Sequence, residues 1–301
     1  MMSPKTIESL RCFEGLGVRI WYDGVTRQHH DNVMGIFYEE QVLTWKFLGD
    51  KLLKTISSTA GEIDFLDVGT GSGFWAILVA KQLQKLGRAA QIIAIDKVER
   101  AVEVCKQNMT ENNIEFTLKQ QAYQTTSAPT RGVKVIFMNP PYHIYPSILE
   151  EFVPHHARGG AFGYQEFISW LSVADYYLAE GGSIFFHDMC LGNEYPEFLR
   201  FIPLFINGSP SIYYYEIFPP KDTFSFLRAV YEYEFAPFIY ETAIRFPRVF
   251  FTSGVIVKDG FGDSHKEEVS DDLLAGASWQ DRISLHKSIA EIAKTMMSRG
   301  D

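Results

Sequence analysis

The first segment suited to chemistry is a run of alternating glycines behind an acidic residue. The run contains Gly69, Gly71 and Gly73, and Asp67 stands two residues before it at the end of an apolar stretch. Glycine suits such a loop because a tight turn with unusual φ lets the backbone approach a ligand that a Cβ would exclude. We therefore expect a ligand to rest against this loop.

The spacing of these glycines separates two kinds of ligand. A dinucleotide-binding loop has the pattern Gly-x-Gly-x-x-Gly and places a pyrophosphate on the N-terminus of the next helix. Here the pattern is Gly-x-Gly-x-Gly, and the carboxylate of Asp67 would repel a pyrophosphate. An acid at this position suits an ammonium group, bound directly or through water, such as the one on the methionine moiety of S-adenosylmethionine.

Two further positions follow the next strands of the chain. Asp96 ends the apolar run at residues 92–96, where a carboxylate could accept both hydroxyls of a ribose. An isolated Asp at such a point is more often a helix cap, but its pairing with the glycine loop favours the ribose role. After the following strand the chain reads Gln120-Gln121-Ala122-Tyr123. Backbone groups near Ala122, or the side chain of Gln121, are the candidates for contact with an adenine.

A second segment suited to chemistry is the bend Asn139-Pro140-Pro141-Tyr142, which follows the apolar run at residues 133–138. The Asn139 oxygen and the following carbonyl, held rigid by Pro140, could each accept an N–H from a planar nitrogen and localise its lone pair. Tyr142 could stack on a flat acceptor. A surface turn would explain the prolines but not their place at a strand end.

These segments resemble known enzymes. The glycine loop resembles motif I of the class I S-adenosylmethionine-dependent methyltransferases. The Asn-Pro-Pro-Tyr bend resembles the motif of amino methyltransferases that modify the exocyclic nitrogen of adenine or the amide of a protein glutamine. The glycines at 159, 160 and 163 are similar to a loop of the release-factor glutamine methyltransferases. The resemblance covers roughly residues 65–188, and it departs from the family after residue 119, where a polar or acidic residue beside the adenine is usual.

The resemblance implies S-adenosylmethionine as the cofactor and N-methyl transfer as the reaction. It implies cofactor contacts at Asp67, Gly69, Gly71, Gly73, Asp96, Ala122 and Asn139, and catalytic roles for Asn139, Pro140 and Tyr142. The acceptor would be a protein glutamine amide, or an amine on a base or small molecule. An adenine amino-methyltransferase acting on RNA or DNA and a non-catalytic S-adenosylmethionine-binding module remain as alternatives. A nicotinamide-dependent oxidoreductase is disfavoured by the glycine spacing and by Asp67.

The order of apolar runs predicts the fold. Strand patterns at residues 63–68, 91–95, 115–119, 133–138 and 183–187 alternate with helix patterns at 75–86, 100–109 and 166–178. Such alternation predicts an α/β fold with a doubly wound, mostly parallel seven-stranded Rossmann-like sheet and helices on both faces. Later strands are expected at 212–218, 229–235 and 248–257, and a terminal helix from Trp279. We expect an N-terminal helical or accessory segment at 1–55, the cofactor-binding domain at 56–260 and a C-terminal helical segment at 261–301.

Composition limits the remaining choices. The chain has 301 residues, 46% of them hydrophobic, and a formal net charge of −9. This charge disfavours a nucleic-acid acceptor and favours a protein or small-molecule one. No signal-peptide or membrane-spanning pattern is visible, so we expect a cytoplasmic protein. The histidines at 143, 155, 156 and 187 lack metal-ligand spacing, so we expect solvated or pocket-lining histidines and no metal.

Overall fold

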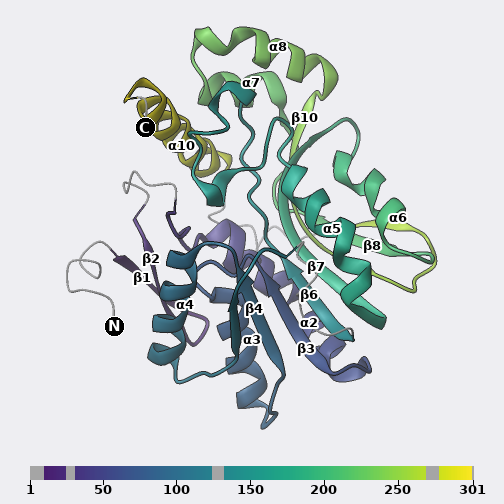
Figure 1. Ribbon diagram of the computed structural model, residues 1–301. Helices are drawn as coiled ribbons and strands as arrows, with labels where there is room; N and C mark the ends of the chain where they lie inside the picture. The colour runs from purple at the N-terminus through teal and green to yellow at the C-terminus, as the bar shows by residue number, and fades with distance from the viewer. Residues whose placement is uncertain (1–9, 25–30, 124–131, 269–277, 300–301) are drawn as a thin grey trace.

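The computed structural model describes residues 10–24, 31–123, 132–268 and 278–299 (Figure 1). A nine-stranded sheet runs through it in the order β11-β8-β10-β7-β6-β3-β4-β5, with β9 paired to β10. Its parallel part consists of β3 (Ile63–Val68), β4 (Ile92–Asp96), β5 (Thr117–Gln120), β6 (Val133–Met138) and β7 (Leu178–Gly192). The expectation of an α/β fold with a mostly parallel sheet is confirmed, and two short strands raise the expected seven to nine.

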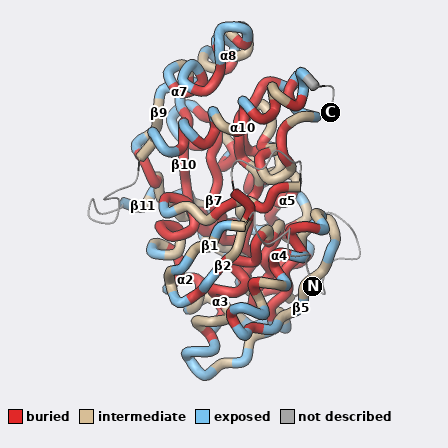
Figure 2. The backbone as a smooth tube through the Cα atoms, turned by 90° about the vertical axis from the view of Figure 1, so that its left-hand side faces the viewer, coloured by how far each residue is buried: buried red, intermediate tan, exposed pale blue. Residues whose placement is uncertain are grey.

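Helices cover both faces of the parallel part. They are α2 (Leu43–Ser58), α3 (Phe74–Lys85), α4 (Glu99–Asn112) and α5 (Gln165–Tyr177), and a π-helical turn, η1 (Tyr38–Val42), leads into α2. Successive side chains of a strand point to opposite faces, so Phe65 packs with α2 and α3 while its neighbour Leu66 packs with α5. The sheet is therefore buried on both sides, and Figure 2 shows β7 coloured mostly as buried.

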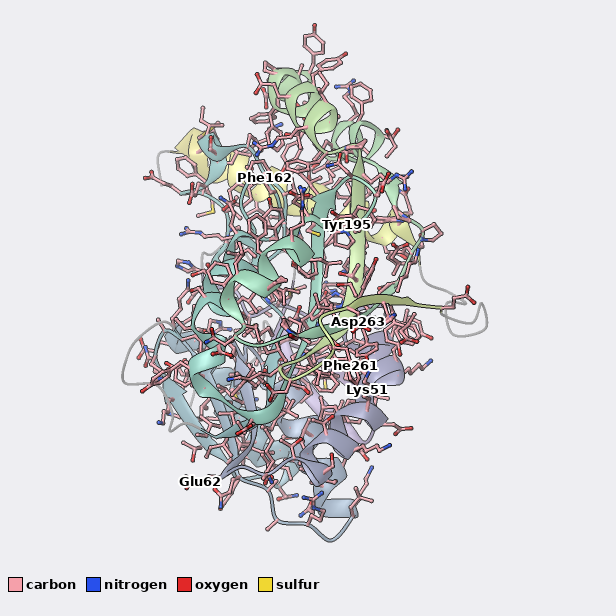
Figure 3. All side chains as sticks on the ribbon, turned by 90° about the vertical axis from the view of Figure 1, so that its right-hand side faces the viewer. Lys51, Glu62, Phe162, Tyr195, Phe261 and Asp263 are labelled. Atoms are coloured by element: carbon pink, nitrogen blue, oxygen red, sulfur yellow. The ribbon has the colours of Figure 1, made fainter. Side chains whose placement is uncertain are left out.

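The sheet continues through antiparallel strands on the side of β7. β10 (Arg248–Val257) runs antiparallel to both β7 and β8 (Ser211–Glu216), and β9 (Lys221–Asp222) and β11 (Ser264–Glu267) are short additions. Near this edge, Lys51 of α2 lies 4.2 Å from the ring centre of Tyr213, and Asp263 accepts a hydrogen bond from the Ser211 hydroxyl (Figure 3). The tyrosines at 213–215 thus belong to β8, one strand in from the edge.

The strand expected at residues 229–235 is absent, and this prediction is wrong. The segment contains the end of α7 (Thr223–Val230) and the 3-10 helix η5 (Tyr233–Phe235). The buried residues Phe226, Leu227, Val230 and Tyr231 follow helical spacing, so packing selected the 3.6-residue period over the alternation of residue types.

The second half of the chain adds a helical cap over the carboxyl end of the sheet. The cap contains α7, α8 (Ala236–Arg245) and the expected terminal helix α10 (Trp279–Arg299), which packs against α7. Shorter helical turns are η2 (Ser147–Leu149), η3 (His155–Ala157), η4 (Glu197–Phe201) and α6 (Ile202–Phe205). Among the described residues, no helix combines enough length and apolar character to cross a bilayer.

The described chain starts with a hairpin, within the segment at 1–55 that was expected to be helical or accessory. β1 (Leu10–Gly15) and β2 (Val18–Asp23) pair antiparallel, and helix begins only at Tyr38. Two buried asparagines of α4 hold β2. The Asn108 side chain accepts from Trp21 N–H and donates to Trp21 C=O, and Asn112 does the same with Arg19.

Candidate active site

A cavity opens at the carboxyl ends of β3, β4, β5 and β6, and together with the solvent space at its mouth it spans about 1040 Å³. The strand order reverses between β3 and β6, which is where ligands bind in open α/β sheets. The register pairs Val68 with Met138, so Gly69 and Asn139 leave the sheet side by side. The glycine loop and the Asn-Pro-Pro-Tyr bend therefore meet at one rim.

The glycine loop has the backbone that its sequence predicts. Gly69, Gly71 and Gly73 adopt φ of +65°, +54° and +82°, a region that L-residues with a Cβ rarely adopt. A Cβ on Gly69 would lie 2.5 Å from Trp170, and one on Gly73 would lie 2.5 Å from the Cys105 sulfur. A Cβ on Gly71 would meet nothing nearer than the Gly69 carbonyl oxygen at 4.0 Å. Gly71 is therefore the point where the loop leaves room for a ligand.

Asp67 is not among the residues that line the cavity, and its contact with an ammonium group, directly or through water, stays a prediction. Its side chain is 2% exposed and turns beneath the loop. One carboxylate oxygen accepts from the Thr70 hydroxyl at 2.6 Å and from the Ala76 N–H at 3.2 Å. Burial raises the pKa of Asp67 to about 7. The acid thus ties the loop to the first turn of α3.

Asp96 lines the cavity at the end of β4. Its Oδ2 accepts from Gly71 N–H and its Oδ1 from Val98 N–H, both at 2.9 Å. Burial raises the pKa of this carboxyl above its usual value. Each oxygen keeps a lone pair beyond these bonds, so the carboxylate could accept two hydroxyls of a ligand. Asp96 does not cap α4, because the N-cap residue of that helix is Val98 and no side chain caps it. The bond from Val98 N–H instead fixes the turn that leads into α4.

The segment after β5 forms the next part of the wall. Gln121, Ala122 and Tyr123 all line the cavity. The Gln121 N–H donates to the Asp96 carbonyl at 2.9 Å, and its side-chain Nε2 is buried without a hydrogen-bond partner among the described residues. Tyr123 packs on Tyr177 with ring centres 5.2 Å apart. Gln121 thus presents an unused donor where an adenine contact was expected.

Asn139 and Pro140 line the same cavity from the end of β6. The Asn139 Nδ2 donates to Glu40 Oε1 at 3.0 Å. The other end of this amide, Oδ1, is buried and has no partner among the residues that the structure describes. A buried oxygen without a donor is costly, so this atom is suited to receive an N–H from a bound molecule.

Tyr142 lies behind the cavity, and its stacking on an acceptor stays a prediction. It is 1% exposed and is absent from the cavity wall. Its hydroxyl donates to Glu40 Oε2 at 2.7 Å, and its ring packs edge-on against His187 and Phe251. The Tyr142 hydroxyl is therefore held by Glu40 inside the protein.

Several wall residues were missed by the sequence analysis. They come from the stretch before η1, from α3 and from α5, and include Val33, Met34, Gly35, Ile36, Trp75 and Trp170. Glu40 and Arg282 were missed as well. A signal was available for Arg282, a charged residue three positions before Leu285 on the apolar side of the predicted terminal helix.

The histidines that drew attention in the sequence are dispersed. His155 and His156 line the cavity, His187 bonds to Thr44 and Ser253, and the His143 ring lies 3.9 Å from that of His286. In the described ranges no group of three or more His, Cys, Asp or Glu side chains is placed to hold a metal ion.

Comparison with known proteins identifies the same region. Residues 46–158 match the family described as Methyltransferase small domain. Release factor glutamine methyltransferase of Pasteurella multocida (strain Pm70) is 29% identical over 109 residues, 35% of this chain and 35% of that protein. The protein of the same description from Flavobacterium psychrophilum is 31% identical over 107 residues, 33% of this chain and 36% of that protein.

A solved S-adenosylmethionine-dependent methyltransferase of Agrobacterium tumefaciens superimposes with a TM-score of 0.47 at 13% identity, covering 83% of this chain and 70% of that one. The chain spans about a third of the length of the two curated relatives described above. The segment that holds the glycine loop, Asp96 and the Asn-Pro-Pro-Tyr bend is thus similar to a methyltransferase small domain.

Proposed function

We propose that this protein is an S-adenosylmethionine-dependent methyltransferase that methylates a planar nitrogen. One observation carries the proposal: Val68 and Met138 are paired in register, so the cofactor loop and the acceptor bend open into one cavity. The two named relatives are release factor glutamine methyltransferases, and each matches over about a third of its length. A protein glutamine amide is therefore the first acceptor to test, and an adenine amine in RNA or DNA the second.

The cavity fits S-adenosylmethionine. Gly71 leaves room for a ligand where a Cβ would intrude, and Asp96 has free lone pairs for the ribose hydroxyls. The Nε2 of Gln121, which has no partner in the described part of the chain, suits an acceptor nitrogen of adenine. Trp170 also lines the cavity and would place an aromatic ring near a positively charged group. When bound, S-adenosylmethionine would supply an electrophilic methyl group.

The chain's own part in the reaction is to hold and polarise the acceptor nitrogen. The Asn139 Oδ1 would accept one N–H, and the carbonyl of Pro140, fixed by the proline ring, would accept another. These bonds would draw the nitrogen out of its plane and direct its lone pair towards the methyl carbon. As the N–C bond forms, the bond between sulfur and the methyl carbon would break, its electron pair would stay on sulfur in S-adenosylhomocysteine, and the nitrogen would lose one proton to water. Positioning and hydrogen bonding supply the rate enhancement.

The test combines binding and turnover. Calorimetry with S-adenosylmethionine, S-adenosylhomocysteine and NAD should give binding to the first two alone. Binding to NAD alone would overturn the proposal. Methyl transfer from radiolabelled cofactor should then be measured to glutamine-containing peptides, to adenine-containing oligonucleotides and to small amines. Cofactor binding without transfer to any acceptor would favour a non-catalytic binding module.

The matched variant is Asn139→Ala. This variant should bind the cofactor but lose about two orders of magnitude or more in turnover, because the side-chain oxygen that Asn139 supplies acts mainly on the transition state. Unchanged turnover in this variant would remove Asn139 from the mechanism.

A further inference from the structure

Glu40 is a fully buried carboxylate beneath the candidate acceptor site. It lies in η1 and is 0% exposed. Its Oε1 accepts from Asn139 Nδ2 and from Gln41 Nε2, both at 3.0 Å. Its Oε2 accepts from the Tyr142 hydroxyl at 2.7 Å and from Arg282 Nη1 at 3.3 Å. All four of these neighbours act as donors towards it.

A buried charge of this kind needs a counter-ion, and the terminal helix provides it. Arg282 of α10 is 1% exposed and pairs with Glu40 and, through Nη2, with Glu39. Its guanidinium also lies 4.8 Å from the ring centre of Phe37 and 5.6 Å from that of Phe251. Burial raises the pKa of Glu40, and the charge of Arg282 and the bonds from Tyr142 and Asn139 oppose that rise. Because all four neighbours donate to Glu40, we assign it the ionised form, with Arg282, more than 240 residues along the chain, as its counter-ion.

The carboxylate decides which way round the Asn139 amide sits. An ionised carboxylate only accepts hydrogen bonds, whereas a primary amide has a donating end and an accepting end. Because Glu40 takes the Nδ2 end, Oδ1 is left as the free end of the amide, buried and without a partner among the described residues. The reverse orientation would set the Oδ1 of Asn139 against the oxygen of Glu40.

We propose that Glu40, with Arg282 as its counter-ion, is a positioning residue that fixes the Asn139 amide with its oxygen available to the methyl acceptor. This inference rests on the proposed function and narrows its substrate class. The acceptor must bring an N–H to meet that oxygen, so primary amides and primary or secondary amines fit and tertiary amines do not. Glu40 touches neither cofactor nor acceptor and acts through Asn139.

The decisive variant is Glu40→Gln. Arg282 keeps Glu39 as a partner in this variant, so one buried cation still faces one carboxylate. The positive charge attracts the oxygen of the new amide and repels its NH2 group, which then faces Asn139. Asn139 should respond by turning its own oxygen inwards, which leaves its NH2 group on the acceptor side.

Nuclear magnetic resonance of asparagine-labelled protein tests this rotation without an acceptor. The side-chain NH2 signal of Asn139 is identified by its loss in Asn139→Asp. Its exchange with water should become about tenfold faster or more in Glu40→Gln, because the bond to a buried carboxylate is lost. The matched control is Glu39→Gln, which alters the other carboxylate on Arg282 and should leave the signal unchanged. Unaltered protection in Glu40→Gln would overturn the proposal.

A double-mutant cycle tests the same idea by turnover. Glu40→Gln should lower kcat about 10- to 100-fold and leave the Kd for S-adenosylmethionine within about twofold, since Glu40 is no part of the cavity wall. In the Asn139→Ala background it should cost nothing further, because its effect passes through Asn139. If the losses in kcat of the two single variants add up in the double variant, or if cofactor affinity falls as much as kcat does, Glu40 has only a structural role. Either result would contradict the proposal.

These experiments distinguish a failure of the proposed function from a failure of the proposal for Glu40. Normal turnover in Asn139→Ala alone would count against the proposed function, whereas additivity in the cycle counts only against Glu40. If Glu40→Gln folds poorly, Glu40→Asp replaces it, because the shorter side chain keeps the charge but withdraws it from Asn139. The same loss of NH2 protection is expected there, and its retention would equally contradict the proposal.

Discussion

Gly71 has only a hydrogen as its side chain, and this leaves space for a ligand in the cavity. The three loop glycines share positive φ, but their surroundings differ. Gly69 and Gly73 make room for Trp170 and Cys105, so their absent side chains serve packing inside the protein. A Cβ on Gly71 would have no atom nearer than 4.0 Å, and the Gly71 N–H donates to the carboxylate of Asp96. Ligand binding and fold stability therefore make separate demands on neighbouring glycines.

Replacement of Gly71 by Ala tests this separation. The methyl group would enter the cavity, and the positive φ at this position would cost about 1 kcal/mol. We expect the Kd for S-adenosylmethionine to rise about tenfold or more by calorimetry, with a small loss of stability. Gly73→Ala is the matched variant, and its Cβ would strike the Cys105 sulfur, so urea unfolding should show a larger loss of stability. Native cofactor affinity in Gly71→Ala would contradict the assignment.

Asp96→Asn is expected to weaken cofactor binding about 100-fold, since one oxygen becomes an NH2 group that faces a backbone N–H of Gly71 or Val98. Loss of one charged acceptor and repulsion between two donors together cost about 2 to 3 kcal/mol. Calorimetry measures the affinity. Asp50→Asn, an exposed change on α2, is the control and should bind normally. Equal affinity for both variants would exclude Asp96 from the binding site.

Among the elements, α4 joins the N-terminal hairpin to the glycine loop. The buried Asn108 side chain bonds to both backbone groups of Trp21 and also donates to the Ser72 carbonyl at 2.7 Å. At the far end of β2, Asp23 pairs with Arg100 of α4 and exchanges two hydrogen bonds with Val33 in the cavity wall. The hairpin thus holds one wall of the site against the helix that follows Asp96.

Removal of this link should affect stability and binding together. Asn108→Ala leaves Trp21 N–H and the Ser72 carbonyl without their partner, which should lower the free energy of unfolding by about 2 to 4 kcal/mol. Cofactor affinity should fall as well, because Ser72 belongs to the loop. Urea unfolding and amide exchange at Trp21 measure the effect. Thr110→Ala, an exposed change on the same helix, should be neutral, and a stable Asn108→Ala would contradict this account.

Across the whole molecule, the C-terminal cap buries polar groups around the site that water would otherwise solvate. His143 and His286 are buried and His156 is partly buried, and removal from water lowers the pKa of each ring. His156 bonds to the Asn32 carbonyl at 3.1 Å, and its pKa falls to about 4. Such a histidine stays neutral in the folded protein at a pH where the unfolded chain takes up a proton.

The difference between the pKa of His156 in the unfolded chain and in the folded protein predicts that the fold loses stability in acid. Between the ordinary histidine pKa of about 6.5 and the folded-state pKa of about 4, the unfolded state binds a proton at His156 that the folded state refuses. Stability is therefore lost as the pH falls through this window. From about pH 7 to about pH 4.5 the contribution is on the order of 2 to 3 kcal/mol. Over the same interval, the free energy of unfolding of His156→Gln should fall by about 2 to 3 kcal/mol less than that of the original protein, as measured by urea unfolding.

Buried acids such as Asp67, whose pKa is raised, have the opposite effect on stability. They act equally in both proteins, so their effect cancels when the two are compared. Identical pH dependence in the two proteins would refute the assignment.

Short residue patterns in the sequence predicted where the main residues of the site lie on the sheet. Glycine spacing, an acid at a strand end and prolines at another strand end are requirements of the backbone, and they place Gly71, Asp96 and Asn139 at one rim of a parallel sheet. The strand expected at residues 229–235 failed because a short apolar run fits both periods, and contacts with distant residues chose the helix.

The direction in which polar side chains point was decided by tertiary structure alone. The sequence determined that an acid precedes the glycine loop and that a tyrosine closes the bend, but Asp67 turns to α3 and Tyr142 turns to Glu40. Those partners lie on other elements, and Arg282 lies about 240 residues away from Glu40. A hydrogen bond forms only where the packed fold brings a donor and an acceptor within about 3 Å of each other. For residues far apart in the sequence, no local pattern determines the distance between these two atoms.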